Sequence, residues 1–350
     1  MRGRGFAALA LGALLCLPGC GWMDGSYVSV TPHQIGISQM GEGSAQPIES
    51  YTQLRAALIR MVDEGRAEGL FALEEYPREN AMEDVERAVE YVTEVYPIGA
   101  YAVESVEHAF GTNAISVDIT YRCSPQEIGS IRTVRGADGA QEAVAAALDA
   151  CEEKLVLQIS GYRDMDFTAI VRDYAWRNPD RIMENPSVMP QVFPDRGDTR
   201  VVELQFVYRT DRETLRSMRE EVQPVFSSAA LYVSGQSSDR TKYSELYTFL
   251  TERFDYQAAY TVTPAYSLLC RGIGDSRAFS QVYAAMCQRI GLEAESISGT
   301  RNGQTHWWNL IRLDGKWYHL DLIASAEFLP MTDGEMNGYE WDRDTYPATK

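Results

Sequence analysis

Clusters of basic residues are absent from this chain of 350 residues, in which 32 Lys and Arg face 50 Asp and Glu and the net charge is −18. Nucleic acids are polyanions bound by clustered Lys and Arg side chains, so we expect no nucleic acid partner. The few histidines are scattered, at His33, His108, His306 and His319, and no Cys-x-x-Cys pair occurs. Because nothing here has the spacing of a metal site, the sequence predicts no metal and no cofactor.

Long hydrophobic runs are also scarce. The run Phe6–Leu17 is continuous, but about a dozen apolar residues are too few to cross a ~30 Å hydrocarbon core. Two arginines precede it and Leu17-Pro18-Gly19-Cys20 follows, a pattern that resembles a bacterial lipoprotein signal with its lipobox. The resemblance implies that residues 1–19 are a signal peptide and that Cys20 is acylated. It predicts a lipid-anchored protein on the extracytoplasmic face of the cell membrane.

Cysteine is rare beyond this signal, occurring at Cys123, Cys151, Cys270 and Cys287. An extracytoplasmic location permits disulfides, and proximity in the sequence favours the pairs Cys123–Cys151 and Cys270–Cys287. Free buried thiols are the equal alternative. Residues 20–50 are rich in Gly, Ser, Gln and Pro and indicate a tether.

The middle of the chain contains an internal similarity. The segment Val117–Arg122 recurs at Leu204–Arg209, and two earlier pairs of segments resemble each other at comparable offsets: 54–58 with 144–148, and those ending at 91 and 174. Alternating apolar residues predict strands at Ile115–Tyr121 and Val201–Tyr208, and helical spacing predicts a helix at Tyr243–Phe254. We predict two duplicated α+β modules, at 51–138 and 139–235, whose charged residues form solvated faces.

The last third of the chain carries the chemistry. Gly272 and Gly274 precede Asp275, which is a good N-cap for a helix that runs to Ile290. Ser276 therefore falls in the first helical turn, a favourable place for a nucleophile.

A hairpin follows this helix. The two apolar runs around Asp314-Gly315 indicate a two-residue turn, and this register places Trp308 opposite Asp321. Side chains two residues apart share a face, so His306 lies diagonal to Asp321 at about 7–8 Å between backbones. The carboxylate can then hold the imidazole in one tautomer, while the helix N-terminus approaches from the other side.

These segments resemble the transglutaminase-like superfamily over about residues 240–350. The positions that fall in register with its motifs are Gly272, Gly274, Phe279, Gly291, His306, Trp308, Asn309, Gly315, Trp317, Tyr318 and Asp321. The resemblance implies a papain-like α+β fold, with a helix packed on an antiparallel sheet. It also implies that the family's catalytic cysteine aligns with Ser276, with His306 and Asp321 as partners and Trp308, Asn309 and Trp317 as binding residues.

Two functions follow from the exchanged nucleophile. One is a degenerate domain that binds a peptide, protein, amide or cell-wall component without turning it over. The other is an acyl-transferase or peptide/amide hydrolase in which Ser276 attacks, His306 is the base and Asp321 orients it. Cys270 is a second candidate nucleophile, although it lacks a helix N-terminus, and His319 is a second candidate base.

Overall fold

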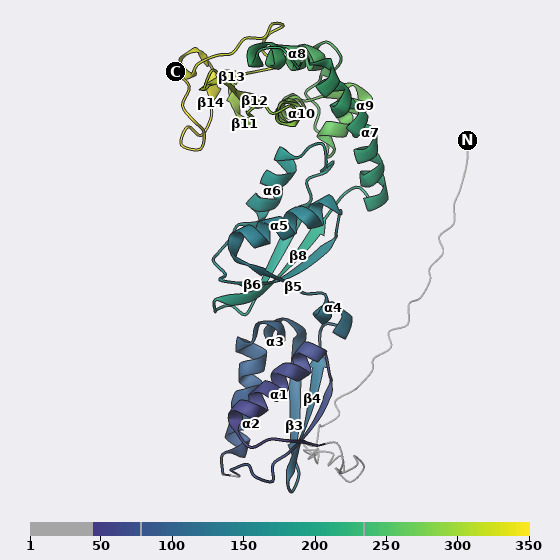
Figure 1. Cartoon of the computed structure of the whole chain (residues 1–350), viewed down its shortest axis with the longest axis vertical. Helices are drawn as coiled ribbons and strands as arrows, with labels where there is room; N and C mark the ends of the chain where they lie inside the picture. The colour runs from purple at the N-terminus through teal and green to yellow at the C-terminus, as the bar shows by residue number, and fades with distance from the viewer. Residues whose placement is uncertain (1–44, 78, 234) are drawn as a thin grey trace, which may run out of the picture. The chain divides into compact units, whose positions relative to one another are not determined.

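The computed structural model describes residues 45–77, 79–233 and 235–350. The predicted signal peptide, Cys20 and most of the tether lie outside the described residues. Residues 45–350 form one compact unit. Helices pack on sheets throughout it, so the predicted α+β fold class is confirmed (Figure 1).

The first sheet and its helices occupy residues 45–121. The elements in chain order are β1 (Gln46–Pro47), α1 (Tyr51–Glu64), β2 (Glu68–Ala72), α2 (Ala81–Glu90), η2 (Tyr91–Val95), α3 (Pro97–Ala102), β3 (Val103–Phe110) and β4 (Ala114–Tyr121). In α1 the buried residues Leu54, Ala57, Leu58, Met61 and Val62 recur at helical spacing and form one apolar face. This face packs on alternate residues of β4, because successive side chains of a strand point to opposite faces of the sheet.

A short helix, α4 (Pro125–Gly129), leads to the second sheet. Its elements are β5 (Arg132–Arg135), α5 (Gly136–Asp149), β6 (Lys154–Ser160), α6 (Phe167–Arg177), β7 (Ser187–Phe193) and β8 (Thr199–Val207). Strand β8 is buried on both faces. Val202 and Leu204 face α5 and α6, whereas Val201 joins a small cluster with Tyr101 of α3.

The two sheets have the same strand order. The first runs β1-β2-β4-β3 and the second β5-β6-β8-β7, in each case with one parallel pair followed by two antiparallel pairs. The segments that resemble each other in sequence fall on equivalent elements: α1 with α5, the end of α2 with that of α6, and β4 with β8. This agreement is what a duplication requires, but the duplication itself stays a prediction.

The sheets also show where the modules begin and end. Strand β5 pairs with β6 in the second sheet, although residues 132–135 fall within the predicted first module. Strand β1 pairs with β2, although residues 46–47 fall within the predicted tether. A strand of two to four residues carries too short a pattern to be assigned from sequence, so pairing alone places it.

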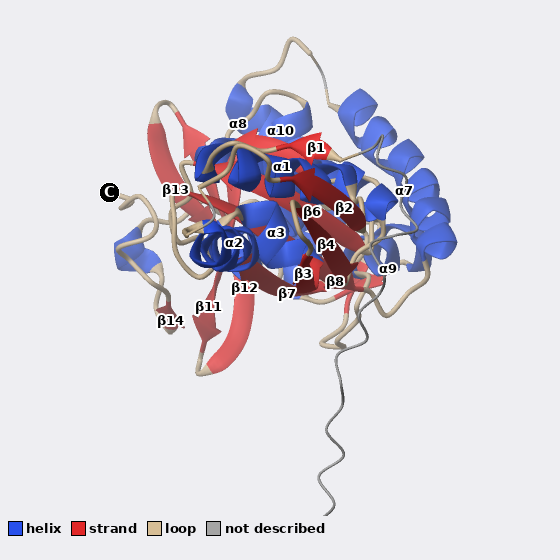
Figure 2. Ribbon diagram, turned by 90° about the horizontal axis from the view of Figure 1, so that it is seen from below, coloured by secondary structure: helices blue, strands red, loops and turns tan. Residues whose placement is uncertain are grey.

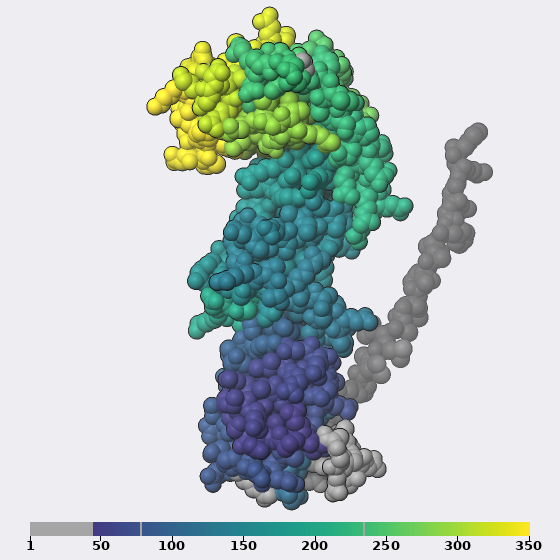
Figure 3. All heavy atoms as spheres, viewed as in Figure 1, coloured from purple at the N-terminus to yellow at the C-terminus, as the bar shows by residue number. Residues whose placement is uncertain are grey.

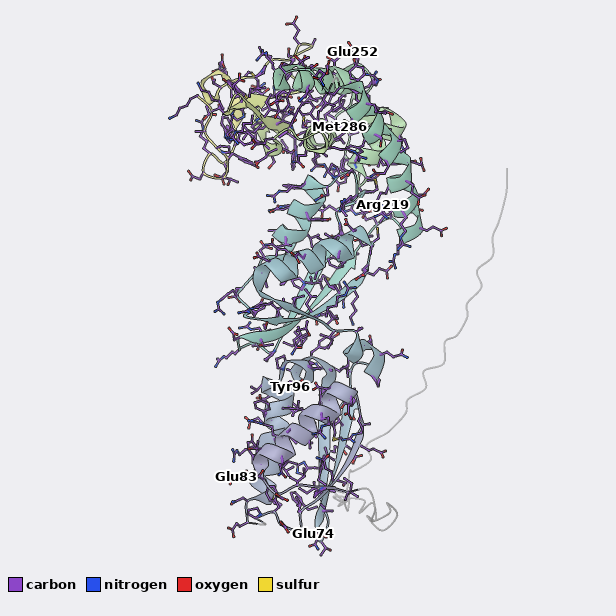
Figure 4. The ribbon with its side chains drawn as sticks, viewed as in Figure 1. Glu74, Glu83, Tyr96, Arg219, Glu252 and Met286 are labelled. Carbon is purple, nitrogen blue, oxygen red and sulfur yellow. The ribbon has the colours of Figure 1, made fainter. Side chains whose placement is uncertain are left out.

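The last part of the chain begins with a long helix. Its elements are α7 (Arg212–Tyr232), α8 (Asp239–Thr251), β9 (Asp255–Tyr256), α9 (Pro264–Arg271), β10 (Ile273–Gly274), α10 (Ser276–Arg289), β11 (Ala294–Arg301), β12 (Gln304–Leu313), β13 (Lys316–Leu320), η3 (Asp333–Glu335) and β14 (Tyr339–Glu340). Helix α7, within the predicted second module, buries Leu215, Val222 and Phe226 in the core formed by α8, α9 and α10. From the same helix, Arg219 donates to the Asp149 carbonyl of the second module at 2.6 Å (Figure 4).

Helix α10 is the centre of this last part. Residues 278–287 are all buried, and Met286 lies deep among the side chains (Figure 4). The helix packs on the antiparallel sheet β13-β12-β11-β14, of which β11 and β12 form a long curved ribbon (Figure 2). The sheet requires a glycine at Gly299, because a Cβ there would meet the Glu340 carbonyl and the Trp308 ring.

The structure also shows whether the described cysteines are paired and whether a described helix could span a membrane. Cys123, Cys151, Cys270 and Cys287 are all free, so the two predicted disulfides are wrong, and the alternative of free buried thiols holds for Cys151 and Cys287 only. Cys151 and Cys287 are buried in the core around α10, where they pack as small apolar side chains. Among the described residues, no helix combines the length and the apolar character needed to span a bilayer.

Candidate functional site

Ser276 is the first residue of α10. Gly272 ends α9 with φ 81°, β10 follows, and Asp275 then caps α10 by accepting from the Ala278 N–H at 2.9 Å. The predicted cap and the predicted helix start are both present. Ser276 is 7% exposed, so its hydroxyl lies in a mostly buried place at a helix N-terminus.

His306 and Asp321 meet on the sheet. The hairpin turn has φ 50° at Asp314 and 80° at Gly315, and β12 pairs with β13 in the predicted register, with Asn309 opposite Leu320. Asp321 follows Leu320 directly, and its Oδ2 lies 2.7 Å from Nε2 of His306, three residues before Asn309. The predicted contact between this imidazole and this carboxylate is therefore present.

Asp321 is held as a carboxylate by several donors. Burial alone would raise its pKa, but His306, the Tyr339 hydroxyl at 2.6 Å and the Ile323 N–H at 2.9 Å outweigh burial and lower the pKa. Arg301 adds a positive charge, with Nη1 3.8 Å from Oδ2. An ionised, fixed carboxylate can orient the His306 ring and stabilise an imidazolium.

Ser276 is joined to the same strand through the backbone. The Trp307 N–H donates to Ser276 Oγ at 3.3 Å, which places the hydroxyl next to the residue that follows His306. Within the described part of the chain, the side chains of Ser276 and His306 are not hydrogen-bonded to each other. Ser276, His306 and Asp321 thus lie in one region, but the hydrogen bond between Ser276 and His306 that a catalytic triad uses is not formed.

Behind His306 lies an aromatic cluster. The Trp308 ring stacks on the His306 ring at 6.3 Å between centroids, and Tyr339 and Trp341 pack against Trp308 edge-on. Trp308 is fully buried and Trp317 is half-buried in the same cluster. These contacts fix the orientation of the His306 ring, while the predicted binding roles of Trp308 and Trp317 stay predictions.

Asn309 holds the helix to the sheet. Its Nδ2 donates to the carbonyls of Ser280 in α10, at 2.8 Å, and of Glu295 in β11, at 3.2 Å. The side chain is fully buried. These contacts give Asn309 Nδ2 a structural role, Oδ1 has no hydrogen-bond partner within the described residues, and the predicted binding role stays a prediction.

His319 is enclosed in the core. Its Nδ1 accepts from Trp308 Nε1 at 3.0 Å, which leaves Nε2 to donate to Asp333 at 2.9 Å. Burial lowers the pKa of His319 against the opposing effect of Asp333, so the ring is held neutral. Because both ring nitrogens are occupied, the structure does not support His319 as the second candidate base.

The cysteines offer no substitute for the missing sulfur. Cys270 is exposed near the end of α9, and partial burial of its thiol together with the Glu221 carboxylate raises the pKa. Cys287 is fully buried in α10, and burial raises its pKa strongly. Neither thiol has the lowered pKa that activates a cysteine nucleophile.

Sequence reasoning missed the donors around Asp321. Tyr339 and Arg301 come from β14 and β11, and the two residues of β14 give no strand signal of their own. The tyrosine could have been suspected only from its alternation with Trp341. No group of three His, Cys, Asp or Glu in the described parts of the chain could hold a metal ion.

Comparison with known proteins identifies a family for part of the chain. The family model of the transglutaminase-like superfamily matches residues 227–322, which span Ser276, His306 and Asp321. A search of curated proteins found no match. The matched residues begin near the end of α7, the helix that packs into the core of this region.

Solved structures show weaker similarity. A protein described as a TGase is 12% identical with a TM-score of 0.28, over 57% of this chain and 61% of that protein's length. Calcium-bound LapG of Legionella pneumophila is 11% identical with a TM-score of 0.28, over 41% of this chain and 86% of LapG. These similarities are too weak to support any statement about the activity of this chain.

Proposed function

Because residues 227–322 form a transglutaminase-like domain, we propose that this domain binds a peptide, protein, amide or cell-wall component without turning it over. In the family resemblance described above, the catalytic cysteine is replaced by Ser276. We also propose that the protein is held at the extracytoplasmic face of the cell membrane through acylated Cys20.

One observation supports the proposal that the site does not catalyse a reaction. Ser276 Oγ accepts a hydrogen bond from the Trp307 N–H and makes none to His306. A thiol can be held as thiolate by a helix N-terminus and an imidazolium, whereas an alcohol must lose its proton to a base during attack. In this geometry Ser276 has no hydrogen bond through which its proton could pass to His306.

The negative charge of Asp275 also favours binding without turnover. This N-cap carboxylate precedes Ser276 and would oppose a thiolate at position 276. In a serine-containing domain it only caps α10, so a carboxylate is compatible with a binding role there.

The first test asks whether Ser276 is a nucleophile. Wild type and Ser276→Ala are treated with a fluorophosphonate, which phosphonylates nucleophilic serines with loss of fluoride, and the mass of the tryptic peptide 272–277 that contains Ser276 is measured. We expect no labelling of Ser276. Labelling of Ser276 that is lost in His306→Ala would contradict the proposal and support the enzyme.

The second test restores the sulfur. In a Cys270→Ser background, which removes the exposed thiol, Ser276→Cys should be alkylated by iodoacetamide at pH 7 on the order of tenfold faster than an unperturbed cysteine. The acceleration should disappear with His306→Ala, because the imidazolium stabilises the thiolate. Should the thiol react no faster than an unperturbed cysteine, both with His306 and with His306→Ala, the binding function would stand and the serine enzyme would be excluded.

The serine enzyme is the second candidate, and the His306–Asp321 contact favours it. A carboxylate with a lowered pKa, hydrogen-bonded to a buried imidazole, is the arrangement that general-base catalysis uses. Hydrogen bonds at such sites often form only when substrate is bound. The fluorophosphonate experiment separates this candidate from the binding function.

Membrane attachment is tested separately. Cys20→Ser should move the protein from the membrane fraction to the soluble fraction, because no acyl chain can then be added. Cys16→Ser, within the predicted signal peptide, is the matched control and should leave the protein attached. Equal membrane retention of Cys20→Ser and wild type would reject lipid anchoring through Cys20.

A further inference from the structure

A cavity of about 200 Å³ lies where the second module meets α10. Helix α6 and the loop after it form one wall, and the Arg277–Gln281 side of α10 forms another. In the space-filling view the teal atoms of the second module lie directly against the green atoms of the last part of the chain (Figure 3). Neither Ser276 nor His306 lines the cavity, so what it binds is a separate question from the proposed function.

A buried donor without an acceptor lines the cavity. Gln281 is 3% exposed, and its Nε2 makes no hydrogen bond within the described part of the chain. A buried amide N–H without a partner is uncommon in proteins, because it gives up its hydrogen bonds to water and gains none. Because Gln281 lines the cavity, a molecule bound there can supply the acceptor that this donor lacks.

A second donor of the same kind comes from the preceding helical turn. Arg277 lies four residues before Gln281, on the same side of α10, and its buried Nε is also unpartnered. Its Nη2 donates to the Thr261 carbonyl at 2.8 Å, and its guanidinium lies over the Tyr260 ring, 5.4 Å from the centroid. The guanidinium is thus fixed in place, and it makes no ion pair with any described residue.

The charges around the cavity favour an anion. Two guanidiniums, of Arg277 and Arg209, line it together with one carboxylate, of Glu184. Both oxygens of Glu184 are already engaged, by the N–H groups of Arg209 at 2.6 Å and Thr210 at 3.0 Å. In a chain of net charge −18 this lining is locally positive.

The rest of the lining is apolar and limits the size of the occupant. Side chains of this kind are Ala175, Ile182, Met183, Val207, Val262 and Pro264. A cavity of 150 Å³ is large enough to hold benzene, so one of about 200 Å³ has room for a molecule of roughly ten heavy atoms. Ligand sites commonly combine such an apolar wall with a few placed polar groups.

We propose that this cavity binds a small carboxylic acid with an apolar body, whose carboxylate accepts hydrogen bonds from Gln281 Nε2 and Arg277 Nε. The apolar body lies against the side chains of α6 and of the loop that follows it. Trp176 lines the cavity and packs on Trp307, with 4.6 Å between ring centroids, and the Trp307 N–H donates to Ser276. The bound acid is therefore one aromatic contact away from the candidate site.

The test is isothermal titration of the full-length protein in detergent with acetate, isovalerate and phenylacetate, and with the primary amide of each. We expect saturable binding of at least one acid with a Kd of about 1 mM or tighter, and binding at least about tenfold weaker for its amide. Gln281→Leu and Arg277→Met should each weaken binding about tenfold or more. Gln288→Leu, an exposed position on α10 away from the cavity, should bind as wild type does.

Three outcomes would overturn the proposal. They are no saturable binding of any acid up to about 10 mM, amides that bind as tightly as the acids, and equal affinity in Gln281→Leu and Gln288→Leu. Partition into detergent affects all variants equally, so the difference between these two leucine variants isolates the cavity. Thermal unfolding of each variant shows that it is folded before titration.

Discussion

The two α+β modules share a strand order, and each contacts the next part of the chain through one of its helices. In the first module α3 packs on β8 of the second, and in the second module α6 packs on α10. The two junctions differ in how their buried polar groups are paired. The two modules thus have the same topology, and the side chains at each junction determine how its buried polar groups are paired.

At the first junction the polar contacts of Tyr101, Gln205 and Lys154 converge on one carboxylate. Glu203 of β8 accepts from Tyr101 at 2.7 Å and from Gln205 at 2.8 Å, and Lys154 Nζ lies 2.8 Å away. Burial alone would raise the pKa of Glu203, but these donors outweigh it and lower the pKa. The first junction is complete without a ligand, whereas the second leaves Gln281 and Arg277 with unpartnered donors.

The largest expected effect comes from removing the side chain that closes the first junction. Tyr101 is 5% exposed and packs edge-on against Phe193, so Tyr101→Ala should lower the free energy of unfolding by about 3–5 kcal/mol, measured by urea denaturation. Tyr256→Ala, at an exposed tyrosine, is the control and should cost much less. Equal losses in the two variants would mean that the first junction adds no stability.

A smaller effect is expected from neutralising the carboxylate. Glu203→Gln should cost about 1–3 kcal/mol at pH 7, because Tyr101 and Lys154 lose a charged acceptor. Since the folded-state pKa of Glu203 is lowered, its stabilisation is present above the ordinary glutamate pKa of 4.5 and is lost as the pH falls below that value. The difference from wild type should therefore shrink in acid. The exposed Glu74→Gln is the control and should cost much less than Glu203→Gln at pH 7 (Figure 4).

The smallest effect on the free energy of unfolding should come from the second junction. Gln281→Leu removes a buried donor that has no partner, so without ligand the free energy of unfolding should change by less than about 1 kcal/mol, or rise. The same change at Gln205, which donates to Glu203, should cost about 1 kcal/mol or more. A larger loss for Gln281→Leu than for Gln205→Leu would show that Gln281 has a structural partner in solution.

Local patterns were sufficient for much of the candidate site. Asp275 caps α10, the turn at Asp314-Gly315 has the positive φ angles that an Asp-Gly turn requires, and the register brings His306 to Asp321. Each of these depends on a few neighbouring residues and on the period of a strand, which the chain itself encodes. The strands at 114–121 and 199–207 were found in the same way.

Local patterns were insufficient where distant segments meet. The motif predicts Asn309 as a binding residue, and only the structure shows that its Nδ2 bridges α10 and β11. His319 was predicted as a second candidate base, and only the structure shows that Trp308 and Asp333 occupy both its ring nitrogens. Both lie on strands whose alternation gives the face of the sheet. Alternation does not give what packs on that face.

The sequence by itself determined the α+β class, the helix that starts at Ser276 and the hairpin that carries His306, because capping, turn chemistry and hydrophobic period act over a few residues. Only the tertiary structure decided which donors surround Asp321 and which donors around the cavity remain unpaired. Tyr339 lies 18 residues from Asp321, and the cavity joins α6 to α10 across about a hundred residues of chain. Pairing of buried polar groups depends on packing between such distant segments, and no local pattern records it.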